Sequence, residues 1–367
     1  MLENKTILSI SPFVVKPFLH GSITRVYHIN RYLAQHNRLI FVYRDEGGSL
    51  IPDFPSLPIP NSTPRVGQIF SPLLIRKVKK IVNEQSVDFI LANHLWSGLH
   101  ALAFRSLLNV PLIFDNHNVE YVRFQKMGSP LWPGIWLFER LISRKAYIMQ
   151  CVSDLDKMKL QKSMGLSSHR IRVIENGVDV DKFMNWRTNT IAVRQELGLG
   201  PSDALILFYG SLSYTPNQEA ARILIQEIAP RLERMGVQGE ILIAGNGDLS
   251  IEPPSISTSL KFRRLGFVPD LHGYIQSADL IAAPLMAGSG TRLKILESVA
   301  SERPVVTTSI GAEGLDLAAC APFLTIRDDW DSFAEAIYVT LNRSTGRLSH
   351  DFIVKYDWGN IVKRMGT

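Results

Sequence analysis

The run ADLIAAPLMAGSGTRLKILESVASERPVVTTSIGAEGL, residues 278–315, decides the predicted fold class. It begins with an apolar stretch typical of a buried strand and passes through a glycine-rich turn at 288–291. A helical pattern then leads to a second apolar strand at 305–307. Because parallel strands are usually joined by a crossover helix, the run predicts part of a parallel sheet covered by helices.

The same alternation of short apolar strands and helical patterns extends through both halves of the chain. In the second half, the predicted strands lie at 205–209, 240–244, 280–283 and 305–307, and the predicted helices lie at 217–234, 271–277 and 293–301. In the first half, the predicted strands lie at 6–10, 39–43, 89–92 and 112–114, and the predicted helices lie around 26–34, 71–83 and 98–108. This alternation is typical of α/β proteins with doubly wound sheets.

The chain has 367 residues, a length suited to two domains. Residues 185–201 carry Asn, Thr, Gly and Pro between the two halves, a composition typical of a linker. We therefore predict two facing Rossmann-like domains, over 1–185 and 186–345, with a ligand cleft between them at the carboxyl ends of the strands.

The composition is that of a globular protein, with 46% hydrophobic and 20% charged residues. It excludes disordered, collagen-like and coiled-coil chains. Two cysteines are too few for a disulfide framework or a cysteine-rich metal site. The first fifteen residues do not resemble a secretory signal, and no stretch of about 18 apolar residues suggests a membrane span. We expect a cytoplasmic protein.

The charge balance is mildly basic, with 40 Lys and Arg against 34 Asp and Glu. Without a recognition motif, this excess does not predict a nucleic-acid partner. Basic residues nevertheless cluster at 76–80 and again among aromatic and apolar residues; this second cluster contains Trp132, Trp136, Leu137, Phe138, Arg140, Arg144, Lys145 and Tyr147. Two interpretations stay open, a solvated helix face and a surface for an anionic membrane or a phosphorylated acceptor.

The glycine-rich turn consists of Gly288, Ser289, Gly290 and Thr291 and precedes a predicted helix. Free backbone N–H groups at a helix start favour phosphate. Arg292 and Lys294 place positive charge where the helix dipole disfavours it, which suggests a bound anion. Glu297 lies about 9 Å beyond Thr291 along the helix axis, and its side chain can reach back towards ribose hydroxyls.

Other interpretations of this turn stay open. Glycines at strand-to-helix turns are also common for steric reasons, and Glu297 can simply pair with Lys294 on the helix surface. No G-x-x-x-x-G-K-[ST] motif is present, which argues against a P-loop nucleotidase. The pair Gly245 and Gly247 follows a strand but lacks the third glycine of a dinucleotide fingerprint.

Together, these motifs resemble a retaining glycosyltransferase of the GT-B fold, in the group called family 4. The matching segments are DNHNVE (115–120), VIENGVDVDKF (173–183), LFYGSLSYTPNQEA (207–220), ILIAGNGD (241–248), LGFVPDLHGYIQSADLIAAPL (265–285) and GSGTRLKILESVASERPVVTTSIGAEGL (288–315). The resemblance covers nearly the whole chain. It implies an acceptor-binding domain over 1–185, a nucleotide-sugar-binding domain over 186–345, and a C-terminal helix within 346–367 that crosses back onto the first domain.

The resemblance assigns roles in the second domain. Glu297 matches the second glutamate of the family's E-x7-E element and is expected to bind the donor ribose. Ser289 stands where the first glutamate belongs, so support of the donor sugar passes to Ser289 and neighbouring backbone N–H groups, or is lost. Gly210 and Ser211 match the phosphate-facing turn. The family's downstream Arg and Lys pair is absent, and its charge is expected from Arg292, the preferred candidate, or from Lys294.

Three further matches complete the expected site. Gly21 and Ser22 match the glycine-rich loop near the phosphates and acceptor. His117 matches the histidine that contacts the donor sugar, although it can also cap a turn among its polar neighbours. Phe267 and Val268 occupy the positions where the backbone reads the base. Asp179 and Asp181 spell a D-x-D, but turn chemistry explains them, and no metal site is predicted.

The resemblance implies transfer of a sugar from a nucleotide diphosphate sugar, with retention and without a metal or cofactor. The acceptor is a glycan, a lipid-linked molecule or a small molecule, at the cytoplasmic face of a membrane if the basic cluster binds lipid. Three alternatives remain: a nucleotide-sugar-binding protein without transferase activity, a nucleotide-sugar 2-epimerase of the same fold and, as the weakest, a nucleic-acid-binding module.

Overall fold

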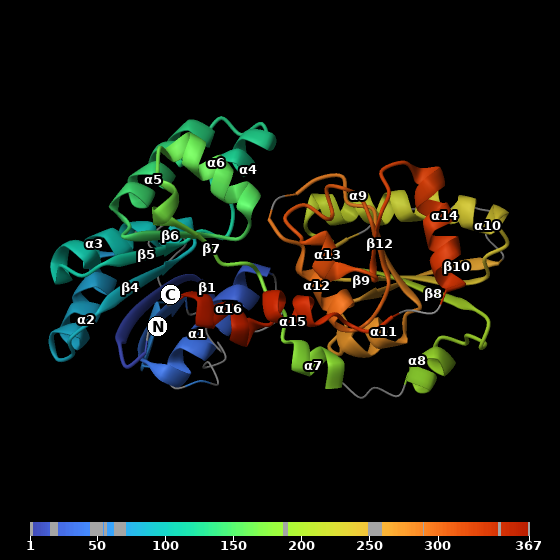
Figure 1. The fold of residues 1–367 in the computed structure, drawn as a ribbon, viewed down its shortest axis with the longest axis horizontal. Coiled ribbons are helices and arrows are strands. Elements are labelled where there is room, and N and C mark those ends of the chain that lie inside the picture. The colour runs from blue at the N-terminus through green and yellow to red at the C-terminus, as the bar shows by residue number, and fades with distance from the viewer. Residues whose placement is uncertain are drawn as a thin grey trace. The chain divides into compact units, whose positions relative to one another are not determined.

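The computed structural model describes residues 3–14, 21–44, 54, 57–61, 71–185, 190–248, 259–288, 290–343 and 346–365. The chain forms two compact units. Unit 1 comprises Met1–Asn176 and Trp358–Thr367, and unit 2 comprises Gly177–Asp357. Each unit is a parallel sheet with helices on both faces, as Figure 1 shows, which confirms the predicted α/β class.

The sheet of unit 1 has seven parallel strands in the order β3-β2-β1-β4-β5-β6-β7. Its strands are β1 (Thr6–Val14), β2 (Arg38–Arg44), β3 (Leu57–Asn61), β4 (Phe89–Asn93), β5 (Leu112–Asp115), β6 (Ile148–Cys151) and β7 (Ile171–Val173). The chain builds outward from β1 in one direction and then from β4 in the other. The strand order therefore reverses between β1 and β4, the position where doubly wound sheets bind ligands.

The helices of unit 1 bury apolar stripes on both faces of this sheet. They are α1 (Gly21–His36), α2 (Pro72–Asn83), η2 (Leu95–Ser97), α3 (Gly98–Leu108), α4 (Glu120–Lys126), α5 (Trp132–Lys145), α6 (Asp154–Met164), η3 (Ser168–Arg170) and α16 (Trp358–Met365). Val78 of α2, Phe104 of α3 and Ile142 of α5 pack in one core. Val26 of α1 and Trp358 of α16 pack in the other. The predicted return of the C-terminal helix to the first domain is confirmed.

The sheet of unit 2 has six parallel strands in the order β10-β9-β8-β11-β12-β13. Its strands are β8 (Ala204–Tyr209), β9 (Gly239–Ala244), β10 (Leu260–Gly266), β11 (Leu280–Ala283), β12 (Val305–Thr307) and β13 (Leu324–Ile326). Here the strand order reverses between β8 and β11, which pair directly.

The helices of unit 2 likewise cover both faces of its sheet. They are α7 (Val180–Asn185), α8 (Thr190–Glu196), α9 (Thr215–Ile223), the π-helical segment η4 (Leu224–Ile228), α10 (Ala229–Arg234), α11 (Leu271–Ser277), α12 (Leu293–Ala300), α13 (Leu317–Cys320), α14 (Trp330–Leu341) and α15 (His350–Tyr356). The continuous helix predicted over 217–234 is thus interrupted by η4. Pro230 follows the π turn and cannot donate the backbone hydrogen bond that would continue an α-helix.

The chain passes between the units after Asn176, ahead of the boundary predicted at 185. Val178 and Phe183 are buried in the core of unit 2, and the Val178 N–H donates to the Tyr356 carbonyl at 2.8 Å. Leu197, inside the predicted linker 185–201, is buried in the same core. Burial of these apolar side chains moves the boundary to 176–177, because they leave water only within unit 2.

Candidate functional site

The reversal of strand order in unit 2 brings two polar turns to the carboxyl ends of β8 and β11. Gly210 and Ser211 follow β8, and residues 288–292 follow β11 and lead into α12. Ligands of doubly wound sheets bind at such a point because the two loops diverge there. The structure therefore places Gly210 and Lys294 together, as the phosphate hypothesis requires.

Lys294 reaches from the first turn of α12 to the turn after β8. Its Nζ donates to Asn217 Oδ1 at 2.8 Å and lies 4.3 Å above the ring centre of Phe208. A Cβ on Gly210 would lie 2.8 Å from this Nζ, so a side chain at position 210 would collide with the lysine, whereas glycine does not. Burial of the ammonium group, reinforced by the nearby charge of Arg292, lowers the pKa of Lys294 to about 7.

Asn217 was not predicted from the sequence, yet it holds both sides of this turn. Besides accepting from Lys294, it donates through Nδ2 to the Ser211 carbonyl at 2.9 Å. The loop after β9 also packs closely against this turn. A Cβ on Gly245, the first residue of that loop, would lie 1.9 Å from the Gly210 carbonyl oxygen. The only local signal for Asn217 is its place near the start of α9, directly after Pro216.

Glu297 lies one turn beyond Lys294 on α12 and is half-buried. Its Oε2 is 3.2 Å from the hydroxyl of Tyr209, which also lies 2.6 Å from the Lys294 carbonyl oxygen. Burial raises the pKa of Glu297, while Tyr209 and Lys294 oppose that rise. Tyr209, the last residue of β8, is a second contact that sequence reasoning missed, because its apolar neighbours mark it only as a core residue.

The glycine-rich turn is folded onto the side chain of Arg292. The Arg292 NH1 donates to the Gly290 carbonyl at 2.6 Å, and a Cβ on Gly288 would lie 2.9 Å from NH2. Arg292 is the N-cap of α12, so the helix begins after the turn rather than within it. Thr291 is buried, and among the described residues its hydroxyl has no hydrogen-bond partner. Ser289 lies outside the described residues.

The two expected base-reading residues follow β10, an edge strand. Phe267 is 64% exposed and Val268 is half-buried. Their strand is two positions from β8 in the sheet, so they lie at the same carboxyl edge as the lysine turn. The exposed ring of Phe267 is available to a flat partner.

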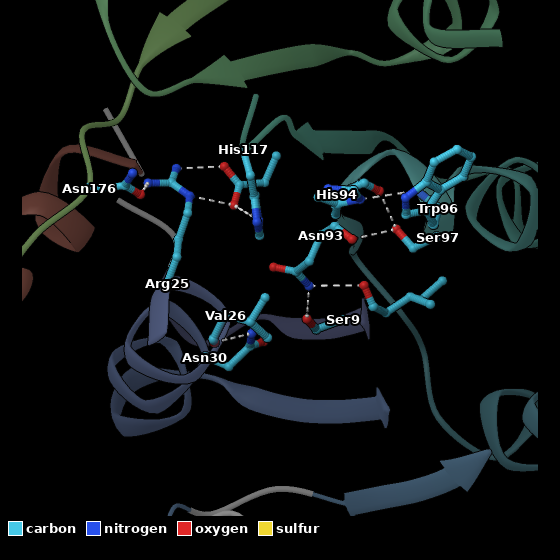
Figure 2. A network of polar contacts seen from close by, with 12 residues as sticks. Ser9, Arg25, Val26, Asn30, Asn93, His94, Trp96, Ser97, His117 and Asn176 are labelled. Carbon is cyan, nitrogen blue, oxygen red and sulfur yellow. Dashed lines mark hydrogen bonds and ion pairs between the residues drawn. The ribbon is translucent and has the colours of Figure 1, made fainter. Parts of the chain in front are cut away.

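In unit 1, the carboxyl edge carries a buried network of charged groups, drawn in Figure 2. Arg25 reaches from α1 to the end of β5, where its Nε and NH2 donate to the two carboxylate oxygens of Asp115 at 2.9 and 2.6 Å. Its NH1 donates to the Glu175 carbonyl at 2.8 Å and to Asn176 Oδ1 at 3.2 Å. The guanidinium therefore joins the end of β5 to the last residues of unit 1 before the chain leaves it.

His117 lies beside this pair and is 3% exposed. Its Nε2 is 3.1 Å from Asp115 Oδ2, and its ring meets the edge of His94 at 5.4 Å between ring centres. Burial lowers the pKa of His117 to about 4, although Asp115 acts against this shift. Burial alone would raise the pKa of Asp115, but Arg25 and His117 hold it well below its usual range. At neutral pH the network is a charged Arg25–Asp115 pair beside a neutral imidazole.

A second buried carboxylate supports the loop that carries His117. Glu139 on α5 accepts from Asn116 Nδ2 at 2.7 Å and from the backbone N–H groups of Glu120 and Tyr121 at 3.3 and 3.1 Å. Burial raises the pKa of Glu139 to about 7. The sequence places Glu139 among aromatic and basic residues, which gives no sign of this role.

The remaining predicted positions have simpler surroundings. Gly21 and Ser22 form the first residues of α1. Asp179 Oδ1 accepts from the Lys182 N–H at 3.1 Å, which confirms the turn interpretation of that residue. Across the ranges that the structure describes, no three or more metal-binding side chains gather into a cluster.

The basic clusters lie on helices of unit 1 that pack side by side, with α3 in contact with both α2 and α5. The exposed basic and apolar side chains there are Leu73, Arg76, Lys77, Lys79 and Lys80 on α2, Leu107 on α3, and Leu137, Leu141, Arg144 and Lys145 on α5. None of the helices formed by the described residues has the length and apolar character needed to cross a bilayer.

Comparison with known proteins gives matches in both units. Residues 203–343 match the family described as Glycosyl transferases group 1, and residues 20–182 match Glycosyltransferase Family 4. D-inositol 3-phosphate glycosyltransferase of Nocardia farcinica is 25% identical over 66% of this chain, which spans 56% of that relative's length. Phosphatidyl-myo-inositol mannosyltransferase of Mycolicibacterium smegmatis is 25% identical over 86% of this chain, and the match covers 78% of that relative's length.

A solved structure shares the fold over nearly the whole chain. The Anabaena protein HepE, in complex with UDP and glucose, has a TM-score of 0.73 at 18% identity and covers 99% of this chain and 98% of its own. The doubly wound sheets, the returning C-terminal helix and the two family matches agree with one another. The chain therefore belongs to the group 1 glycosyl transferases with the GT-B fold.

Proposed function

We propose that the protein transfers a sugar from a nucleoside diphosphate sugar to an acceptor hydroxyl, with retention at the anomeric carbon. One observation carries this proposal. At the strand reversal of unit 2, a glycine turn, the ammonium group of Lys294 and the carboxylate of Glu297 lie within one helical turn of each other. This combination suits a diphosphate next to a ribose.

Lys294 is proposed to bind the diphosphate and to stabilise its charge as it leaves. Its side chain is directed to Gly210, whereas Arg292 is bound to backbone carbonyls of its own turn and of Ile310. These contacts favour Lys294 and reverse the preference drawn from the sequence. Arg292 then orders the turn and adds positive potential. The backbone N–H groups of Gly288, Gly290, Thr291 and Ser211 would complete the phosphate contacts.

Glu297 is proposed to accept hydrogen bonds from the ribose hydroxyls. The Tyr209 hydroxyl holds one of its oxygens, which leaves the carboxylate oriented before a ligand arrives. Phe267 and Val268 would contact the base, mainly through their backbone. HepE, whose fold this chain shares, was solved with UDP and glucose, which supports a donor of this class.

On unit 1, His117 is proposed to contact the transferred sugar, and the backbone at Gly21 and Ser22 is proposed to contact the substrates at the start of α1. Retention would follow from attack on the same face that the diphosphate leaves. In that step the acceptor oxygen bonds to the anomeric carbon, the bond to the diphosphate breaks, and an oxygen of the departing diphosphate takes the acceptor proton. No metal is needed for this step, because Lys294 and the turn meet the developing charge.

The acceptor is proposed to be presented at an anionic membrane by the face of α2, α3 and α5. Four exposed basic residues at 76–80 and the exposed leucines beside them fit a headgroup layer, where each basic residue near the surface contributes about 1 kcal/mol. Sedimentation with phosphatidylglycerol vesicles should exceed that with phosphatidylcholine vesicles. The variant Lys77→Glu/Lys80→Glu should lose this difference, whereas Lys261→Glu on unit 2 should keep it. Equal sedimentation with both vesicles would contradict the membrane proposal.

The proposed sugar transfer is tested by a turnover assay. The protein is incubated in EDTA with UDP-, GDP- and ADP-sugars and a panel of glycan and lipid-linked acceptors, while nucleotide release and the anomeric configuration of the product are followed. Acceptor-dependent release with an unchanged anomeric configuration is the expected result. Conversion of the donor to its 2-epimer without acceptor, or binding without turnover, would contradict it.

A further inference from the structure

The two ring nitrogens of His117 have different surroundings. Nε2 is 3.1 Å from an oxygen of the Asp115 carboxylate. Nδ1 is buried and has no hydrogen-bond partner among the residues that the structure describes. The groups that face the ring are the Asp115 carboxylate, the Arg25 guanidinium behind it, the edge of His94 and the ring of Phe13. None of these is a hydrogen-bond partner of Nδ1.

This asymmetry selects one form of the neutral imidazole. The Nε2–H direction is not aligned with Asp115 Oδ2, so the contact is electrostatic rather than a straight hydrogen bond. An unprotonated Nε2 would nevertheless bring its partial negative charge within 3.1 Å of an anionic oxygen, which is electrostatically repulsive. The proton is therefore favoured on Nε2, and Nδ1 is left as an acceptor.

Arg25 makes this arrangement possible. An isolated buried carboxylate is costly, and it would either take up a proton or charge the neighbouring histidine. The two hydrogen bonds from Arg25 keep Asp115 ionised and balance its charge, so that His117 stays neutral. Arg25 is in turn held by the Glu175 carbonyl and Asn176, at the last residues of unit 1 before unit 2.

We propose that Asp115 and Arg25 are positioning residues that fix His117 as the Nε2–H tautomer, so that Nδ1 accepts a hydrogen bond from a hydroxyl of the transferred sugar. The inference rests on the proposed function for the identity of the ligand, and on the geometry alone for the tautomer. It predicts a donor sugar with a free hydroxyl at the position facing His117. A deoxy or O-methyl sugar at that position leaves Nδ1 without a partner and is disfavoured.

The test reads the tautomer directly. In protein labelled with 15N-histidine, two-dimensional spectra of the imidazole nitrogens at pH 7 should show a protonated Nε2 and an unprotonated Nδ1 for His117, with His117→Gln providing the assignment. His100 is a control in the same spectrum, because its Nε2 accepts from the Ser71 N–H at 2.8 Å and must carry its proton on Nδ1. A protonated Nδ1 on His117 would overturn the inference.

The Asp115→Asn variant should reverse the tautomer. The shorter contact, from Arg25 NH2 to Oδ1, favours an oxygen at that position. The new amide N–H2 then takes the Oδ2 position beside His117, at the cost of the 2.9 Å hydrogen bond from Arg25 Nε. Nε2 then accepts, Nδ1 takes the proton, and turnover should fall about 100-fold, the scale of a misplaced reacting group. Nucleotide affinity should not change. Asp154→Asn, an exposed position on α6, should leave both the spectrum and turnover as they were.

Arg25→Lys keeps the charge but loses the two-pronged contact, and should lower turnover while His117 stays neutral and protonated on Nε2. If Asp115→Asn does not fold, the wild-type spectrum still decides the tautomer. An unchanged His117 spectrum in folded Asp115→Asn would contradict the positioning role. The predicted tautomer without any transferase turnover would instead count against the proposed function and leave the positioning inference intact.

Discussion

The two units share the same strand reversal, yet they hold their central cation in opposite ways. In unit 1, Arg25 is fully paired with the carboxylate of Asp115. In unit 2, Lys294 is held by the neutral side chain of Asn217, and within the described ranges it forms no ion pair. A carboxylate neutralises the charge of the cation that it pairs with, whereas an amide leaves the charge of a protonated amine uncompensated, so that an anionic ligand can pair with it. The first suits a positioning role and the second suits phosphate binding.

The two cations should differ most in how much their removal lowers the free energy of unfolding. Arg25→Met leaves the buried Asp115 charge uncompensated and should lower the free energy of unfolding by about 3–5 kcal/mol. Lys294→Met replaces a desolvated ammonium by an apolar chain of similar length and should change it by less than about 1 kcal/mol. Denaturant unfolding of both variants measures the difference. Equal losses would mean that Lys294 is as structural as Arg25.

The next effect concerns nucleotide affinity. Lys294→Met should weaken binding of the nucleoside diphosphate by about 2–3 kcal/mol, the contribution of a charge-assisted hydrogen bond. Lys261→Met, at an exposed position of β10, is the matched control and should bind normally. Isothermal titration calorimetry measures both variants. Normal binding by folded Lys294→Met would show that Lys294, like Arg25, does not bind the anionic ligand.

The ribose contact proposed for Glu297 is tested by two further variants of unit 2. Glu297→Ala should weaken nucleotide binding by about 1–3 kcal/mol, because the ribose hydroxyls lose their acceptor. Tyr209→Phe removes only the hydroxyl that orients Glu297 and should cost about 0.5–1.5 kcal/mol. The same calorimetric titration checks both values. A loss for Tyr209→Phe that exceeds the loss for Glu297→Ala would assign the ribose contact to the tyrosine.

The pH dependence gives the most gradual effect. The pKa of Lys294 is lowered to about 7, so its ammonium loses its proton as the pH rises above 7. Over pH 7–9 the terminal phosphate, with a pKa near 6, is already ionised. Affinity should therefore fall with rising pH, by up to about tenfold per unit or 1.4 kcal/mol. Lys294→Arg stays charged and should bind with little pH dependence. A flat wild-type profile would place the diphosphate away from Lys294.

The unit 2 site was largely predictable because its residues are close in sequence. The helix Leu271–Ser277 and the strands Leu280–Ala283 and Val305–Thr307 have the predicted bounds, since each is a short apolar pattern between clear turn residues. Lys294 and Glu297 follow the turn on one helix, where periodicity alone relates them. Asn217 was missed because its partner is 77 residues away.

The unit 1 network was not predictable in the same way. Arg25 meets Asp115 across 90 residues and Asn176 across 151, and nothing in the local pattern of α1 marks one arginine as buried. Only His117 was identified, through its resemblance to the family motif. The boundary at 176–177 was missed for a related reason, because burial of Val178 and Phe183 depends on tertiary packing rather than on local composition.

Calorimetric titration of UDP, GDP and ADP, each in EDTA, into the wild-type protein and into Lys294→Met tests most directly whether Lys294 binds the donor diphosphate. We predict that one of the three binds the wild type without a metal and that the variant loses most of that affinity. Failure of all three to bind the folded wild-type protein, or equal affinity in the variant, would contradict a donor site built around Lys294.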